Sequence, residues 1–201
     1  MNDRSSFDTA TRVAAGDDGT TYGSVAIALH WTTAALVLFQ FLTAFTWDWF
    51  SHDTRESIQG LHVSFGILLA LVIAARVTWR LTPGHHVPSL EAGWVKLAST
   101  GVHYLLYVLL VAQAVLGFLV GWSAGHPIHL FGIGIPGPFG PLDRPVRHQI
   151  REIHQWVGYS IVIIAAGHAL AALYHHYRLH DRVLGRMLPP ARKTEEARVR
   201  G

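Results

Sequence analysis

Residues 153–177 have the sequence IHQWVGYSIVIIAAGHALAALYHHY and contain no Asp, Glu, Lys or Arg. A helix rises about 1.5 Å per residue, so these 25 residues are long enough to cross the hydrocarbon core of a membrane. His154 and His168 lie fourteen positions apart, just under four helical turns. Both imidazoles therefore project from nearly the same face, at two depths roughly 21 Å apart. The stretch predicts a membrane helix that offers one ligand at each of two levels.

The composition of the whole chain is also that of a membrane protein. Of 201 residues, 50% are hydrophobic and only 14% are charged, whereas soluble domains carry about 25% charged residues. Cysteine is absent, which excludes disulfides, cysteine-ligated iron–sulfur clusters and c-type haem attachment. The net charge of +3 does not indicate a nucleic-acid partner, because the basic residues flank apolar segments and form no single stripe.

Three more apolar segments precede residues 153–177, and each of the four is long enough to span a bilayer. Their predicted ranges are 25–45, 58–79, 97–122 and 153–177. Backbone polar groups must be satisfied within lipid, so helices are expected, and short connections favour antiparallel neighbours. The predicted fold is an all-α, integral membrane, antiparallel four-helix bundle that forms one domain over residues 25–177.

The segments outside the predicted helices differ in character. Residues 1–24 are polar and lack an apolar stretch, so we expect a disordered tail and no cleavable signal peptide. Residues 178–201 form a basic tail that we expect to be solvated. The long connection 123–151 is apolar and rich in Gly and Pro, which predicts a cap loop against the membrane surface. Its GxGxxG match at Gly132 lacks the flanking strand and helix of a dinucleotide site, so we do not expect that function.

The basic residues predict the orientation of the bundle. Of sixteen Lys and Arg residues, only four lie on the side of the first and third connections: Arg55, Arg144, Arg147 and Arg151. Because Lys and Arg are enriched in cytoplasmic segments, both termini should face the cytoplasm. The cap loop should then lie on the outer side of the membrane.

Four histidines within the apolar segments form two pairs by predicted depth. His30 and His168 lie in the cytoplasmic half, whereas His62 and His154 lie in the outer half, and each pair comes from two different helices. Ionisable residues inside a membrane are costly and often mark function. For a single histidine, a hydrogen bond to a neighbouring helix is an equally good explanation. Two pairs sorted by depth instead favour two metal cofactors.

The number of ligands indicates which cofactor. A closed zinc site requires four protein ligands, whereas a haem iron requires only two axial ligands because the porphyrin supplies the rest. Ligation by two histidines leaves no open coordination position, which favours electron transfer over oxygen binding. We therefore predict that His30 and His168 bind an inner haem iron and that His62 and His154 bind an outer one.

Other spacings agree with haem but have alternative explanations. Arg76 follows His62 by fourteen positions, near the level of the inner pair, where a haem propionate would neutralise it. The alternative is a guanidinium that extends to the membrane surface. Gly66 and Gly158 each follow a predicted ligand by four positions. Glycine allows a flat macrocycle to approach closely, although helix packing explains it equally well.

A fifth membrane histidine, His103, has three possible roles. It can contact a quinone, bond a neighbouring helix, or replace His30 or His168 as a ligand. The remaining histidines lie in connections or at helix ends, and none is predicted to be a ligand. His148, together with the arginines of the third connection, forms an outer basic patch that could steer a small anion to the outer haem.

Several short motifs follow one another in order along the chain. They are Leu29-His30-Trp31, His62 with Gly66, Arg76 and Trp79-Arg80, His103-x-x-x-Tyr107, Ile153-His154-Gln155-Trp156-Val157-Gly158-Tyr159 with His168 and His175-His176, and Arg186-Met187-Leu188-Pro189. In this the chain resembles the bacterial cytochrome b561 family of four-helix, di-haem membrane proteins, over residues 22–189.

The resemblance implies two b-type haems on His30, His62, His154 and His168. It also implies a place in the bacterial cytoplasmic (inner) membrane, with a periplasmic cap loop, and electron exchange with membrane quinone in the respiratory chain. A characterised member type is an oxidoreductase that oxidises superoxide outside the membrane and reduces ubiquinone. Two other functions stay open. One is a membrane-anchor cytochrome b subunit that docks to a separate dehydrogenase or hydrogenase, for which a stable partner chain would be the evidence. The other is a haem-free transporter or proton relay, which would lack a haem absorption band.

Overall fold

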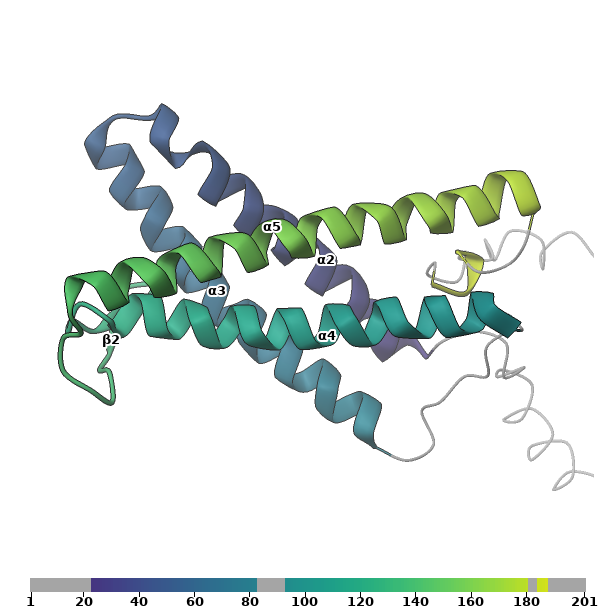
Figure 1. The fold of residues 1–201 in the computed structure, drawn as a ribbon, viewed down its shortest axis with the longest axis horizontal. Coiled ribbons are helices and arrows are strands. Elements are labelled where there is room, and N and C mark those ends of the chain that lie inside the picture. Colours follow the sequence, from purple (N-terminus) through teal and green to yellow (C-terminus); the bar gives the residue numbers. More distant parts are fainter. Residues whose placement is uncertain (1–22, 83–92, 181–183, 188–201) are drawn as a thin grey trace, which may run out of the picture.

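The computed structural model describes residues 23–82, 93–180 and 184–187. Most of the two predicted tails, 1–24 and 178–201, lies outside the described residues. Four long helices make up most of the described chain (Figure 1): α2 (Ser24–Thr46), α3 (His52–Leu81), α4 (Gly93–Trp122) and α5 (Arg144–Tyr174). Each is long and apolar enough to cross a membrane. The predicted all-helical membrane bundle is confirmed.

The helices pack as two antiparallel pairs. In Figure 1, α4 and α5 run side by side along the long axis, and α2 and α3 form a second pair that crosses behind them. Contacts join α2 to α3, α3 to α4, α4 to α5 and α2 to α5. The α2–α3 and α4–α5 connections lie at one end, hereafter the outer end, and the other end is the inner end. At the inner end, Trp31 Nε1 donates a hydrogen bond of 2.8 Å to the carbonyl of Met187.

The apolar core is small, and most large hydrophobic side chains face outward. Leu69, Ile73, Leu110 and Ile161 form a buried cluster that joins α3, α4 and α5. By contrast, the side chains of Leu71 and Ile163 are 60% and 71% exposed. Helices that are hydrophobic on their outer faces are stable in lipid and not in water. The surface of the bundle is therefore suited to a membrane.

Helix α5 is longer than its apolar stretch. It begins at Arg144, after the N-cap residue Asp143 and with a proline in its first turn, a position that proline favours because the missing N–H has no partner there. The cap connection therefore ends at residue 143, where the sequence predicted a loop over 123–151. At its other end, α5 continues as the π-helix η2 (His175–Leu179).

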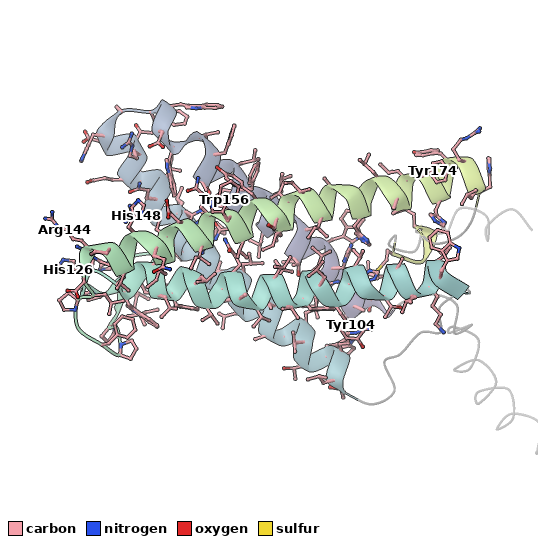
Figure 2. All side chains as sticks on the ribbon, in the orientation of Figure 1. Tyr104, His126, Arg144, His148, Trp156 and Tyr174 are labelled. Carbon is pink, nitrogen blue, oxygen red and sulfur yellow. The ribbon has the colours of Figure 1, made fainter. Side chains whose placement is uncertain are left out.

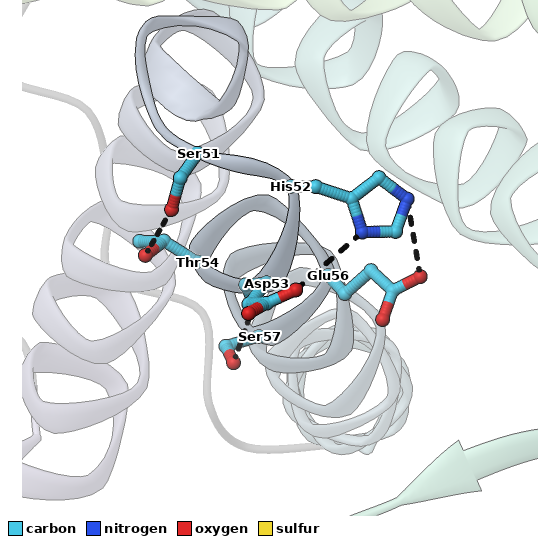
Figure 3. Close-up of polar contacts among 6 residues, drawn as sticks. All are labelled: Ser51, His52, Asp53, Thr54, Glu56 and Ser57. Atoms are coloured by element: carbon cyan, nitrogen blue, oxygen red, sulfur yellow. Dashed lines mark hydrogen bonds and ion pairs between the residues drawn. The ribbon is translucent and has the colours of Figure 1, made fainter.

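Helix α3 also begins before its apolar segment, in a set of exposed polar contacts (Figure 3). After the 3₁₀-helix η1 (Trp47–Trp49), Ser51 Oγ lies 3.1 Å from Thr54 Oγ1, and Ser57 Oγ donates to the carbonyl of Asp53 at 3.0 Å. The His52 ring lies 3.7 Å from the carboxylates of both Asp53 and Glu56. These residues precede the apolar segment 58–79, and the His52 side chain is exposed, away from the predicted ligands.

The connection between α4 and α5 forms a β-hairpin. Strands β1 (Ile128–Leu130) and β2 (Ile133–Ile135) pair antiparallel, and Phe131 and Gly132 turn between them with φ of 47° and 91°. A short strand thus precedes Gly132, contrary to the sequence-based expectation. It pairs with β2 directly, and α5 does not begin until Arg144, so the context of a dinucleotide site is still not met. Residues 128–135 are called the cap hairpin below.

Candidate functional site

The membrane histidines lie in two groups along the bundle. His62 on α3 and His154 on α5 form a pair towards the outer end, with ring centroids 6.5 Å apart and ring planes at 81°. A metal ion about 2 Å from each of two facing imidazole nitrogens would hold the ring centroids about 6 Å apart. The spacing of this pair therefore fits a metal ion held between the two rings, as in a haem with two axial histidines.

The hydroxyl of Thr43 determines which nitrogen of His62 can bind a metal. Thr43 Oγ1 lies 3.0 Å from the carbonyls of Phe39 and Gln40, and 3.1 Å from His62 Nδ1. A hydroxyl has a single proton, which it donates to a carbonyl, so it accepts from the N–H of His62 Nδ1. Nε2 is then left with a lone pair. Histidines that bind metals typically donate their other ring N–H in this way.

His154 is held mainly by α4. Its Cε1 lies 3.4 Å from the position that a Cβ would take on Gly117, and its Nε2 lies 3.3 Å from Gln113 Nε2. Its Nδ1 is buried and has no hydrogen-bond partner. Because an amide nitrogen can only donate, His154 accepts at Nε2 and carries its proton on the unpartnered Nδ1. Nε2 therefore has the lone pair that could bind a metal in place of the contact with Gln113.

The inner group centres on Arg76 of α3. Arg76 Nη2 lies 3.0 Å from Nδ1 of His30, and Arg76 Nε donates to the hydroxyl of Tyr107 at 2.9 Å. A guanidinium can only donate, so His30 accepts at Nδ1 and carries its proton on Nε2. None of the ion pairs found among the described residues includes Arg76. A cation within a membrane span calls for an anionic partner.

His103 and His168 meet in the same inner group. Their ring centroids are 4.9 Å apart at 76°, which is too close for a metal ion between facing nitrogens. His103 Nδ1 lies 2.7 Å from the carbonyl of Ser99, so Nδ1 carries the proton. Electrostatic interactions also link His30 with Arg76, His103 and His168. The structure thus brings together all the predicted inner residues, with His103 against His168.

The family model described as prokaryotic cytochrome b561 matches residues 21–190.

The chain belongs to the prokaryotic cytochrome b561 family. It is therefore a multi-pass membrane cytochrome b, a haem-binding protein of electron transport.

Three relatives illustrate the similarity of this cytochrome to other members. Cytochrome b561 homolog 2 of Escherichia coli (strain K12) is 32% identical, over 83% of this chain and 90% of its own length. Cytochrome b562 of Cereibacter sphaeroides is 27% identical, over 84% and 96% respectively. A Yersinia pestis protein named "Probable superoxide oxidase CybB" is 26% identical, over 85% and 97%.

Sequence reasoning missed several residues of this cytochrome that contact the predicted ligands. Gln40 covers Gly66, and Gln113 covers Gly158, at the two positions where glycine was expected to admit a macrocycle. Thr43 bonds His62, as described above. The glutamines could have been recognised by their polarity. The apolar segments 25–45 and 97–122 each contain a single amide side chain, and a polar group buried in such a segment requires a partner.

The outer end of the cytochrome carries the basic patch predicted from the sequence. Figure 2 shows Arg144 and His148 at the start of α5, at the same end as His126 of the α4–α5 connection, whereas Tyr174 lies at the opposite end. His148 Nδ1 lies 3.6 Å from Glu152, and Nε of Arg147 is buried without a hydrogen-bond partner. The patch is thus only partly neutralised.

Proposed function

We propose that this chain is a di-haem b-type cytochrome that carries electrons across the cytoplasmic membrane, to or from the quinone pool. The observation that carries the proposal is the outer pair. The ring centroids of His62 and His154 lie 6.5 Å apart, and Nδ1–H of His62 donates a hydrogen bond to the hydroxyl of Thr43. These two histidines hold the outer iron, and His30 and His168 hold the inner one. When bound, haem supplies one-electron chemistry at its iron, while the protein sets its position and surroundings.

At the inner level, Arg76 binds a haem propionate. Its present acceptor is Nδ1 of His30, an arrangement that keeps the proton of His30 on Nε2 and prevents this nitrogen from binding a metal. A carboxylate is a stronger acceptor for a guanidinium than a neutral imidazole. Pairing with a propionate therefore neutralises Arg76 and also releases His30 to act as a ligand.

His103 contacts the quinone in this proposal. Its ring lies 4.9 Å from that of His168, too close for a metal ion between them, so these two histidines do not form a pair that holds an iron. Because Nδ1 of His103 donates to Ser99, Nε2 is an acceptor and suits the hydroxyl of a quinol. The exchangeable redox partner is membrane quinone, with ubiquinone as the first candidate.

At the outer end, the proposed electron donor is superoxide. The support is twofold: one relative is named a probable superoxide oxidase, and the outer end carries the basic patch of Arg144, Arg147, His148 and Arg151. Basic surface attracts small anions and raises their local concentration. The activity proposed is therefore that of an oxidoreductase that couples superoxide oxidation to ubiquinone reduction.

The ligand assignment is tested by counting haem in single variants. The purified protein should contain two haems per chain, measured as the pyridine haemochrome and by its reduced absorption band. His30→Ala, His62→Ala, His154→Ala and His168→Ala should each lose about one haem, because an axial ligand is removed. His52→Ala, at an exposed outer histidine, is the matched control and should keep both. Full retention of both haems in His154→Ala would sink the assignment.

The direction of electron flow is tested in proteoliposomes. Superoxide generated outside the vesicles should reduce ubiquinone in the membrane, and the rate should fall in His154→Ala. If superoxide is inactive while quinol reduces the haems rapidly, the proposed direction is reversed.

A further inference from the structure

Two glutamines occupy equivalent places beside the outer histidine pair. Gln40 of α2 lies over Gly66 of α3, where a Cβ on the glycine would be 2.7 Å from Gln40 Nε2. Gln113 of α4 lies over Gly158 of α5, where the corresponding distance to Nε2 is 3.1 Å. Each glycine follows a histidine of the outer pair by four positions. Each helix pair therefore places an amide over the glycine that follows one histidine of the outer pair.

Both amides also contact the histidine itself. Gln40 Nε2 donates a hydrogen bond of 2.9 Å to the carbonyl of His62, and Gln113 Nε2 lies 3.3 Å from His154 Nε2. Helix α2 thus reaches His62 of α3, and α4 reaches His154 of α5, through one side chain each. Contacts of this kind set the orientation of a metal ligand and the polarity around it.

The oxygen ends of these amides are the more informative observation. Oε1 of Gln40 and Oε1 of Gln113 are both buried and have no hydrogen-bond donor. A carbonyl oxygen buried without a donor is costly, and two at one level are unusual. The amide nitrogens, by contrast, contact the carbonyl of His62 and Nε2 of His154. Each amide is thus a polar group in a region of low dielectric constant, where it acts on a nearby charge more strongly than it would in water.

We propose that Gln40 and Gln113 are positioning residues of the outer haem site, and that their amides lower its reduction potential. The proposal rests on the assignment of His62 and His154 to an outer haem. Iron held by a porphyrin and two neutral imidazoles has one more positive charge when oxidised than when reduced. Polar surroundings therefore favour the oxidised form, and an apolar replacement favours the reduced form.

The test is a redox titration of the purified holoprotein with Gln40→Leu, Gln113→Leu and the double variant. Leucine has a similar size and no amide dipole. Each single variant should keep two haems and should raise the midpoint potential of the outer haem alone, and the double variant should raise it further. The outer haem is identified from His30→Ala, which should retain only that haem. Gln155→Leu is the matched control, because Gln155 is an exposed glutamine of α5 that bonds Tyr159.

An unchanged outer potential, or an equal shift of both haems, would overturn the proposal. If a leucine variant loses haem, the longer and more flexible methionine is used at the same position, and the same rise is expected. Failure of the ligand assignment has a different signature. It would appear as two haems in His154→Ala, whereas one haem in His154→Ala together with unchanged potentials in the glutamine variants refutes this proposal alone.

Discussion

At the scale of single residues, the neighbours of each histidine decide which of its nitrogens can bind a metal. Thr43 accepts a hydrogen bond from the Nδ1–H of His62 and leaves Nε2 as the acceptor, whereas Arg76 donates a hydrogen bond to Nδ1 of His30 and leaves the proton on Nε2. His62 is thus already the tautomer with a free lone pair on Nε2, as a ligand requires. His30 reaches that tautomer only when Arg76 has another acceptor.

Thr43→Val should weaken the outer haem site. Valine has the shape of threonine but cannot accept the Nδ1 proton of His62, and loss of such a partner lowers the affinity for a bound metal about 10–100-fold. Haem retention during dilution, with the two haems distinguished by potential, measures the effect. Thr46→Val is the control, because Thr46 lies on the same helix and bonds only the carbonyl of Leu42. Equal haem loss in both variants would refute the role of Thr43.

Arg76→Gln should lower the potential of the inner haem, because a positive charge beside a haem favours its reduced form. Two unit charges roughly 10 Å apart interact by about 1.7 kcal/mol at an effective dielectric constant of about 20, and 1.4 kcal/mol corresponds to about 59 mV for one electron. The expected fall is therefore on the order of 70 mV. Arg76→Lys should recover part of it.

The control for Arg76 is Arg80→Gln. Arg80 lies one turn further along α3, with its guanidinium 5.7 Å from the ring centre of Tyr104. Its replacement should leave both potentials nearly unchanged. A fall of the same size in Arg80→Gln would indicate a general effect of surface charge.

At the scale of elements, one serine of α3 makes two hydrogen bonds to the cap hairpin. The side chain of Ser64, which is 3% exposed, donates to the carbonyl of His129 at 3.2 Å and accepts from the N–H of Phe131 at 3.0 Å. Trp122 of α4 adds a hydrogen bond from its indole nitrogen to the carbonyl of Ile135. Ser64 lies two residues after His62, so the cap is anchored beside the outer pair.

Ser64→Ala should loosen the cap hairpin without unfolding the bundle. The variant leaves a buried donor and a buried acceptor of the cap without partners, at a cost of roughly 1–3 kcal/mol. Amide hydrogen exchange of the peptide that contains Phe131 should therefore be faster. Ser160→Ala is the control, because Ser160 bonds only the carbonyl of Trp156 within α5. Unchanged exchange in the cap would show that Ser64 does not anchor it.

At the scale of the whole molecule, two groups of histidines lie at different depths with apolar packing between them. Leu69 and Ile73 lie along α3 between His62 and Arg76, and Ile161 lies along α5 between His154 and His168. The two connections between paired helices share the outer end. The direction of the bundle in the membrane is a separate question, and experiment can answer it.

The absence of cysteine makes orientation directly measurable. Asp53→Cys at the outer end and Gly185→Cys at the inner end each introduce a unique thiol at an exposed position. In intact cells with a permeabilised outer membrane, an impermeant maleimide should label Asp53→Cys. It should label Gly185→Cys only after the inner membrane is broken, because the basic residues gather at the inner end. The reverse pattern would overturn the predicted topology.

The sequence by itself determined the fold class and the two histidine levels. A segment of about 20 apolar residues has few alternatives to a helix in lipid, and a fixed rise per residue converts spacing into depth. It did not determine where α5 begins, because Arg144, His148 and Arg151 belong to turns outside the apolar span and carry no hydrophobic signal. The cap hairpin was missed as well, since its three-residue strands are too short to show a pattern.

Only the tertiary structure decided which side chains surround each histidine. Spacing brings His62 and His154 to one level, but the contacts of Thr43, Gln40 and Gln113 depend on how each helix is rotated about its axis. The same holds for Arg76, which meets Tyr107 of α4 and His30 of α2. Rotation and crossing angle result from the packing of all four helices together. Depth is therefore a property of one segment, and the choice of partners is a property of the bundle.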